Sequence, residues 1–194
     1  MSVSLIEELK SIRDFRSRKG RRYELWLILL LIVMGMLSGF EGYAALEDFG
    51  VRHYAALCEA LGLTVKRLPS DTTFRRILEH LSFRVLNAHF ERWAMQYSDI
   101  NPEDWMSLDG KSIKGTVLEG GTEYQNFVTL VSLYSQSQET VLATEQFETH
   151  QTNEIKAVQT LLERLHIKDV VFTLDAIHAQ KKQPSKLSMA AMTM

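Results

Sequence analysis

Apolar residues recur at helical spacing through the first hundred residues of the chain. Residues 24–36 are apolar on every side, which predicts a central helix buried within a small helical bundle. Apolar positions three to four residues apart predict two short helices over 43–61, with a break at Gly50 and an end at Gly62. The first part of the chain is therefore expected to be helical.

A turn at Pro69 precedes the next predicted helix. Ser70 and Asp71 are able to cap free backbone N–H groups, which favours a helix that begins here. Its inward face is predicted to hold Phe74, Ile77, Leu78 and Leu81. A further helix is predicted over 83–97, with Leu86, Phe90, Trp93 and Ala94 inward.

The pattern changes after Asn101 and Pro102. Short runs rich in β-forming residues lie at 105–108, 127–134 and 141–147, and turn residues separate them. Helical spacing returns over 153–166, and the continuous apolar run 170–174 is typical of a buried strand. The expected fold class is α + α/β. A helical domain over 1–100 is followed by a mixed sheet over 101–180, and residues 181–194 form a tail without a pattern of either kind.

Composition adds little about function. The chain is 45% hydrophobic and 24% charged, as in ordinary globular proteins, and its net charge is only -2. One cysteine, Cys58, excludes an internal disulfide and a cysteine-based zinc site, which favours a reducing compartment.

The uncharged run from Leu25 to Phe40 raises the question of a membrane segment. It is 16 residues long, whereas a spanning helix needs about 20 apolar residues. We therefore favour a buried core helix and a cytoplasmic protein, and a membrane-anchored protein is the less favoured alternative.

Positive charge is concentrated near the N-terminus. Seven basic residues lie between Lys10 and Arg22 with one acidic residue, Asp14, among them. Such a cluster on a helical region can neutralise DNA phosphates, and a solvated charge run is the alternative interpretation. The predicted DNA contacts of this domain are Arg16, Arg18, Lys19, Arg21, Arg22, Arg75 and Arg76.

Two aspartates follow apolar strands of the second domain. Asp109 and Asp175 each come at the predicted carboxyl end of a strand, where α/β proteins bind ligands. If the strands are neighbours, the carboxylates converge, and hard oxygen ligands favour Mg²⁺ or Mn²⁺. Such a site suits two-metal phosphoryl transfer. An aspartate at a strand end is also a common helix cap or turn former.

Three further residues of this domain are candidate DNA contacts. Lys111 and Lys114 lie beside Asp109, and His178 follows Asp175 by three residues. Gly110-Lys111-Ser112 is not a phosphate loop, because Trp105 stands where that motif needs glycine.

Several segments resemble one known family. They are Asp109 to Gly115 (DGKSIKG), His150 to Ile155 (HQTNEI), Thr173 to Gln180 (TLDAIHAQ) and, in the first domain, Arg16 to Gly50 and Leu68 to Arg76. In this order they resemble the ISAs-type, or H-repeat-associated, insertion-sequence transposases over about residues 10–180.

The resemblance implies an RNase H-like catalytic domain that cuts and rejoins DNA with an Asp, Asp, Glu triad and two Mg²⁺ ions. Asp109 and Asp175 take the first two positions as metal ligands. Glu154 matches a family-typical residue whose role does not follow from the resemblance. The implied partners are the terminal inverted repeats of the element, a second copy or an intact transposase, and no membrane. The implied location is the bacterial cytoplasm at the nucleoid.

The sequence departs from the family pattern after Gln180. The third acid of the family lies well beyond the second Asp, whereas here 19 residues follow Asp175. Residues 181–194 resemble the product of a frameshift, so the expectation is a C-terminally truncated, inactive transposase. The alternative is a non-catalytic module that binds DNA or an intact transposase.

Overall fold

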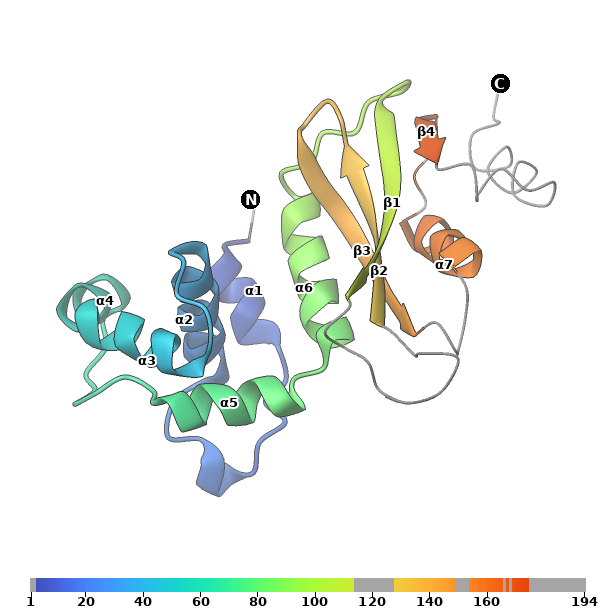
Figure 1. Cartoon of the computed structure of the whole chain (residues 1–194). Coiled ribbons are helices and arrows are strands. Elements are labelled where there is room, and N and C mark those ends of the chain that lie inside the picture. The colour runs from blue at the N-terminus through green and yellow to red at the C-terminus, as the bar shows by residue number, and fades with distance from the viewer. Residues whose placement is uncertain (1–2, 114–127, 149–153, 166, 168, 175–194) are drawn as a thin grey trace, which may run out of the picture. The chain divides into compact units, whose positions relative to one another are not determined.

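The computed structural model describes residues 3–113, 128–148, 154–165, 167 and 169–174. Within these residues, a series of helices is followed by a four-stranded mixed sheet, so the fold is α+β (Figure 1). The chain divides into two compact units, Met1–Trp93 and Ala94–Met194. Each unit has its own hydrophobic core.

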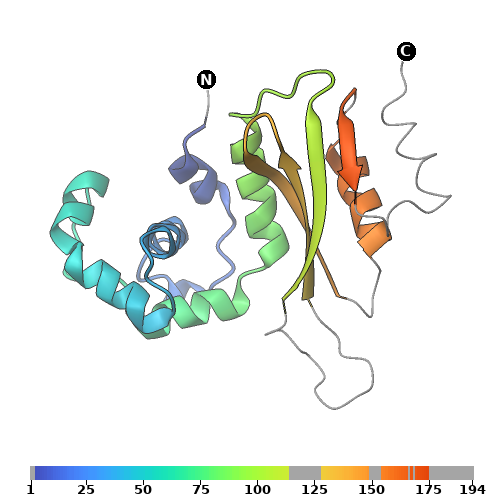
Figure 2. The ribbon, with the colours of Figure 1, turned by 45° about the horizontal axis from the view of Figure 1, so that its top comes forward.

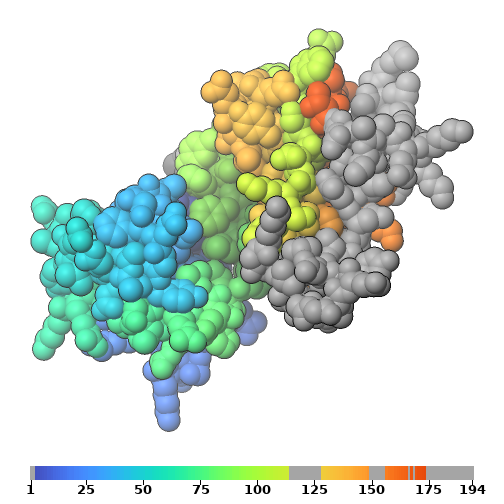
Figure 3. All heavy atoms as spheres, viewed as in Figure 1, coloured from blue at the N-terminus to red at the C-terminus, as the bar shows by residue number. Residues whose placement is uncertain are grey.

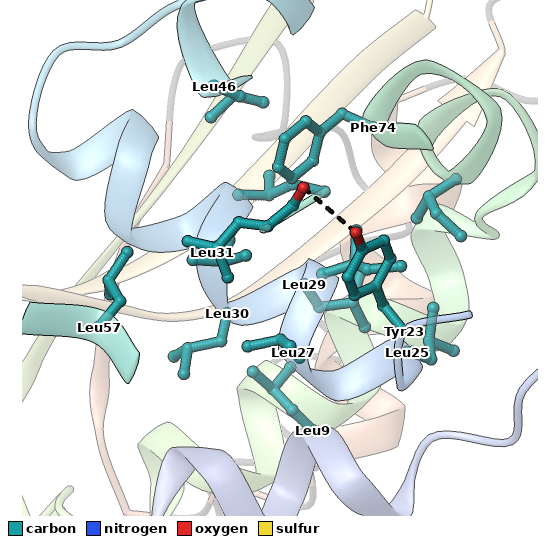
Figure 4. Close-up of a cluster of buried hydrophobic side chains, with 14 of the residues drawn as sticks. Leu9, Tyr23, Leu25, Leu27, Leu29, Leu30, Leu31, Leu46, Leu57 and Phe74 are labelled. Atoms are coloured by element: carbon teal, nitrogen blue, oxygen red, sulfur yellow. Dashed lines mark hydrogen bonds between the residues drawn. The ribbon is translucent and has the colours of Figure 1, made fainter. Parts of the chain in front are cut away.

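The helical unit is built around helix α2 (Leu25–Leu37). Seven of its apolar side chains are buried, on all sides of the helix, which confirms the predicted central helix. Figure 2 shows α2 nearly end-on, and its close packing partners are α1 (Leu5–Ser11) and α3 (Tyr43–Arg52). Leucine side chains from these elements, together with Tyr23 and Phe74, fill the core (Figure 4).

The predicted helix break at Gly50 is wrong. Helix α3 continues through Gly50, and the break comes at His53, before α4 (Tyr54–Leu61). Gly50 is buried, and a Cβ placed there would lie 3.5 Å from the Cβ of Leu68. Gly50 is therefore an interior residue of the helix, and the space beside Leu68 would admit a methyl group at ordinary contact distance. Gly62 ends α4 in the left-handed conformation, as predicted.

Helix α5 (Asp71–His80) begins where the sequence predicts, with Ser70 as N-cap. The Ser70 side chain makes no capping hydrogen bond to the backbone. Instead, the Asp71 N–H donates to Glu47 Oε2 of α3 at 3.0 Å. Phe74 and Ile77 are buried as expected.

Leu78 does not belong to the inward face of α5. It is 37% exposed, because it lies beside the buried stripe and not within it. Helix α6 (Phe83–Met95) follows, and it ends two residues before the predicted boundary.

The second unit contains four strands in the order β3-β2-β1-β4. They are β1 (Trp105–Ile113), β2 (Val128–Ser135), β3 (Thr140–Glu148) and β4 (Val171–Leu174), and α7 (Glu154–Leu165) lies between β3 and β4 in the chain. β1, β2 and β3 pair antiparallel, and β4 pairs parallel with β1. Apolar residues of β1, β2, β3 and α7 form the core of this unit.

Strand β4 is less buried than a continuous apolar run predicts. Val171 is 38% exposed, and Phe172 and Thr173 are half-buried. The reason is position, because β1 is the only strand beside β4 in the described sheet. Among the described residues, no helix has the length and apolar character needed to span a membrane.

Candidate functional site

Asp109 lies in the middle of β1, and the predicted end of that strand at Leu108 is wrong. The antiparallel ladder with β2 continues past it, from Asp109↔Ser132 to Ile113↔Val128. Glycine, lysine and serine after Asp109 have weak strand propensity, so their local sequence does not predict this extension. The backbone hydrogen bonds to β2 extend the strand.

The described parallel pairing between β1 and β4 reaches the residues that precede the two aspartates. It runs from Trp105↔Val171 to Leu108↔Leu174, and these last partners directly precede Asp109 and Asp175 in the chain. The condition for two converging carboxylates, that their strands are neighbours, is therefore met. Asp175 itself lies outside the described residues, as do Lys114, His178 and the tail over 181–194.

Asp109 stands on a polar face of the sheet. Alternation along β1 puts Ser107, Asp109 and Lys111 on the face opposite to the buried Met106 and Leu108. Asp109 and Lys111 are exposed. On the neighbouring strand, Thr173 Oγ1 lies 2.9 Å from Ser107 Oγ. This face presents carboxylate and hydroxyl oxygens.

Such oxygen donors suit a hard divalent cation such as Mg²⁺ or Mn²⁺. Within the described part of the chain, no three acidic, histidine or cysteine side chains cluster as a metal site. Asp109 is therefore one candidate ligand of a site whose other expected acid, Asp175, is not described. Glu154 is the first residue of α7.

In the helical unit, Arg16 is held inside the protein and is only 11% exposed. Its Nε and one terminal nitrogen donate to the two carboxylate oxygens of Asp14 at 3.0 and 2.8 Å. Its terminal nitrogens also donate to the carbonyl oxygens of Gly20 and Tyr23, at 3.2 and 2.7 Å. The hydrogen bond from the Arg16 side chain lowers the pKa of Asp14, and Arg21 adds to this shift. These contacts indicate a structural role for Arg16.

The other cations of the N-terminal cluster face solvent. Arg18 and Lys19 lie in the short 3-10 turn η1 (Arg18–Gly20), whose blue atoms lie beside α5 in Figure 3. Arg22 is exposed, and its guanidinium carbon lies 5.7 Å from the centre of the Tyr23 ring. Arg21 donates to the carbonyl oxygen of Arg16 at 2.7 Å.

The two adjacent arginines of α5 differ in their surroundings. Arg75 Nε lies 2.8 Å from Glu79 Oε1 on the solvent side of the helix, and this contact raises the pKa of Arg75. Arg76 instead lines a pocket of about 220 Å³. Its lining residues are Arg16, Lys19, Gly20, Arg22, Tyr23, Arg67, Ser70, Thr73 and Arg76.

Sequence reasoning missed Arg67 as a candidate contact. It lies between α4 and α5, about 45 residues from the N-terminal basic cluster, and only folding brings it to the same pocket. The adjacent basic pair Lys66-Arg67 before the Leu68-Pro69 turn was the available signal.

Residues 6–94 match the family model described as DDE_Tnp_1-associated. The helical unit is therefore similar to domains described as associated with this class of transposases. The chain is also 28% identical to the "Putative transposase YncI" of Escherichia coli K12, over 96% of this chain and 74% of that protein.

Two further relatives come from the same organism. The "H repeat-associated putative transposase YhhI" is 28% identical over 94% of this chain, which spans about half (47%) of that relative's length. The "H repeat-associated putative transposase YbfD" is 27% identical over 94% of this chain and 71% of its own length. The chain is therefore similar to H-repeat-associated putative transposases over most of its length, which bears out the resemblance seen in its motifs.

Proposed function

We propose that this chain acts in DNA transposition, with a metal-dependent site on the sheet and a DNA-binding helical unit. The observation that carries the proposal is the parallel register of β1 and β4, which pairs Leu108 with Leu174, the residues directly before Asp109 and Asp175 in the sequence. When bound, Mg²⁺ or Mn²⁺ supplies activation of the attacking oxygen and stabilisation of the leaving oxygen in phosphoryl transfer.

The proposal requires the register to continue by one residue. In parallel strands, residues in register share a face and lie about 4.8 Å apart. Asp175 would then stand beside Asp109 on the polar face that carries Ser107 and Lys111. Two carboxylates at this separation repel each other, and a divalent cation between them removes the repulsion. In this arrangement the two aspartates hold the cation, and Lys111 faces the DNA backbone.

The order of elements supports an RNase H-like sheet. Three antiparallel strands, a helix and a strand parallel to β1 follow one another in the chain. Asp109 lies in β1, and Asp175 is the residue that follows β4 in the sequence. The resemblance to the transposase family implies the same fold from the motifs alone. We therefore assign the sheet to this fold as part of the proposal.

A third acid is needed for the family's chemistry. The 194-residue sequence contains no Asp or Glu after Asp175. We therefore propose that Asp109 and Asp175 bind a divalent cation, and we assign no third acidic ligand among the 194 residues.

Affinity cleavage tests the metal site without requiring catalysis. Fe²⁺ is added to the protein so that it binds at the proposed divalent-cation site. Ascorbate and peroxide then generate radicals that cut the backbone beside the bound ion. We expect cuts near residues 109 and 175 that excess Mg²⁺ suppresses. The Asp109→Asn variant should lose both cuts.

The matched control is Glu139→Gln in the turn between β2 and β3, which should keep the cleavage pattern. Cuts that persist in Asp109→Asn, or that never include the region of Asp175, would contradict the shared site.

The second candidate function is a non-catalytic module that binds DNA through the helical unit. The pocket lined by cations in this unit favours it. This function predicts DNA affinity that falls steeply with salt and is unchanged in Asp109→Asn. Fluorescence anisotropy of a labelled duplex at several salt concentrations measures the salt dependence of the affinity and the affinity of the Asp109→Asn variant.

A further inference from the structure

The pocket beside α5 combines many cations with no carboxylate in its lining. Five basic side chains line it: Arg16, Lys19, Arg22, Arg67 and Arg76. Asp14 neutralises Arg16 from outside the lining. The other four form no ion pair with any acidic side chain that the structure describes. Like charges gathered in this way repel each other, so the pocket favours an anion.

Hydrogen bonds hold the two chain segments that form the pocket. The Tyr23 hydroxyl donates to the carbonyl oxygens of Arg67 and Leu68, at 3.1 and 3.3 Å, and Figure 4 marks a bond of this hydroxyl. Arg16 donates to the carbonyl oxygens of Gly20 and Tyr23 on the other segment. The backbone of the pocket is therefore ordered before any ligand arrives, which lowers the entropic cost of binding.

The size and donors of the pocket suit a phosphate group. Its volume of about 220 Å³ is several times the ~30 Å³ that a water molecule occupies in the liquid, so a phosphate fits together with some water. Guanidinium groups bind phosphate oxygens through paired N–H donors. The hydroxyls of Ser70 and Thr73, which also line the pocket, are additional donors.

The lining favours a backbone phosphate over a free nucleotide. Tyr23 is its only aromatic residue, and this ring is 8% exposed with Arg22 packed near it. A base therefore finds no free aromatic surface on which to stack. Recognition of phosphate without a base contact is the kind that positions a protein on DNA without reading sequence.

We propose that this pocket binds a phosphate of the DNA backbone, with Arg67 and Arg76 as its principal ligands and Lys19 and Arg22 beside them. This inference rests on the proposed DNA binding by the helical unit. It separates the basic residues of that unit into two groups. Arg76 and Arg67 contact phosphate, whereas Arg16 supports the pocket and Arg75 pairs with Glu79.

The test compares Arg67→Gln and Arg76→Gln with Arg75→Gln in the full chain. Arg75 is the matched control, because it neighbours Arg76 on the same helix but does not line the pocket. Duplex affinity is measured by fluorescence anisotropy across a salt series, and circular dichroism verifies the fold of each variant. Inorganic phosphate binding is measured separately by NMR titration.

We expect each pocket variant to bind duplex DNA about tenfold more weakly, since a hydrogen-bonded charge is lost. Its slope of log affinity against log salt should fall by about 0.9, the value for one phosphate contact. The Arg75→Gln variant should keep both quantities near those of the unmodified chain. The Arg76→Lys variant should recover the slope, because the charge remains.

Equal losses in all three variants would overturn the pocket in favour of a general basic face. If the Arg67→Gln and Arg76→Gln variants lose inorganic phosphate binding but keep the DNA affinity of the unmodified chain, the pocket is a site for free phosphate. That result would overturn the DNA assignment. If the unmodified chain binds no DNA, the proposed function fails. The phosphate titration then decides separately whether the pocket binds anions.

Discussion

Replacement of Arg16 by alanine is expected to destabilise the helical unit strongly, although Arg16 lies within a cluster of otherwise exposed cations. The guanidinium is 11% exposed and donates to the Asp14 carboxylate and to two backbone carbonyls. Its removal leaves a carboxylate that is only 17% exposed. The same change at Arg75 removes a solvent-exposed pair with Glu79.

The expected loss for Arg16→Ala is about 3 kcal/mol in the free energy of unfolding. Breaking a buried pair costs roughly 3 to 5 kcal/mol, because the remaining charge is uncompensated. The lower end applies here because Arg21 Nε still lies 3.4 Å from an Asp14 oxygen. The control Arg75→Ala should lower the free energy of unfolding much less, because an exposed pair at this helical spacing contributes little.

Hydrogen exchange of the α2 amides measures the opening free energy of this unit within the full chain. Removing Asp14 together with Arg16 should recover at least about 1 kcal/mol, because no charge is then left without a partner. A loss below about 1 kcal/mol for Arg16→Ala, or no recovery in the double variant, would refute the structural role of this pair.

Further changes test the pH dependence and packing of the helical unit. The pKa of Asp14 is lowered from its ordinary value of 3.8, so its contribution to stability is present above that pH and is lost as pH falls through the lower folded-state pKa. Asp14→Asn should remove this part of the acid dependence of α2 exchange. Gly35→Ala should destabilise by about 1 to 2 kcal/mol despite better helix propensity, since its Cβ would lie 2.6 Å from a Leu46 methyl carbon. Gly50→Ala should instead stabilise by about 0.5 kcal/mol, because its nearest contact is an ordinary 3.5 Å. Urea unfolding of both glycine variants measures the difference, and equal midpoints would contradict it.

Several elements follow from local sequence because their cause is local. Helix α2 is apolar on every side, so burial is the only stable placement for it, and the structure buries it. The end of α4 at Gly62 follows from the left-handed conformation that glycine adopts readily. The motifs around Asp109 and Leu68 likewise resemble H-repeat-associated transposases, and the similarity of most of the chain to such putative transposases bears this out.

Other features depend on a partner distant in sequence. Strand β1 extends past Asp109 because β2 supplies the backbone hydrogen bonds. These bonds outweigh the weak strand propensity of the residues that follow Asp109. Gly50 resembles a helix breaker, yet it lies inside α3, where it is buried and packs against Leu68. Neither partner can be identified from spacing along the chain.

The sequence alone determined the order of helices and strands from α2 onward, the concentration of positive charge near the N-terminus and the resemblance to H-repeat-associated transposases. It did not predict α1. It could not distinguish the roles of the individual arginines, because all of them carry the same charge and similar local surroundings. Helix α5 sets the local pair of Arg75 with Glu79, whereas tertiary folding shields Arg16 and Asp14 from solvent and brings Arg67 and Arg76 to one pocket. An arginine's function depends on which groups lie within hydrogen-bond reach, and only the tertiary structure decides that.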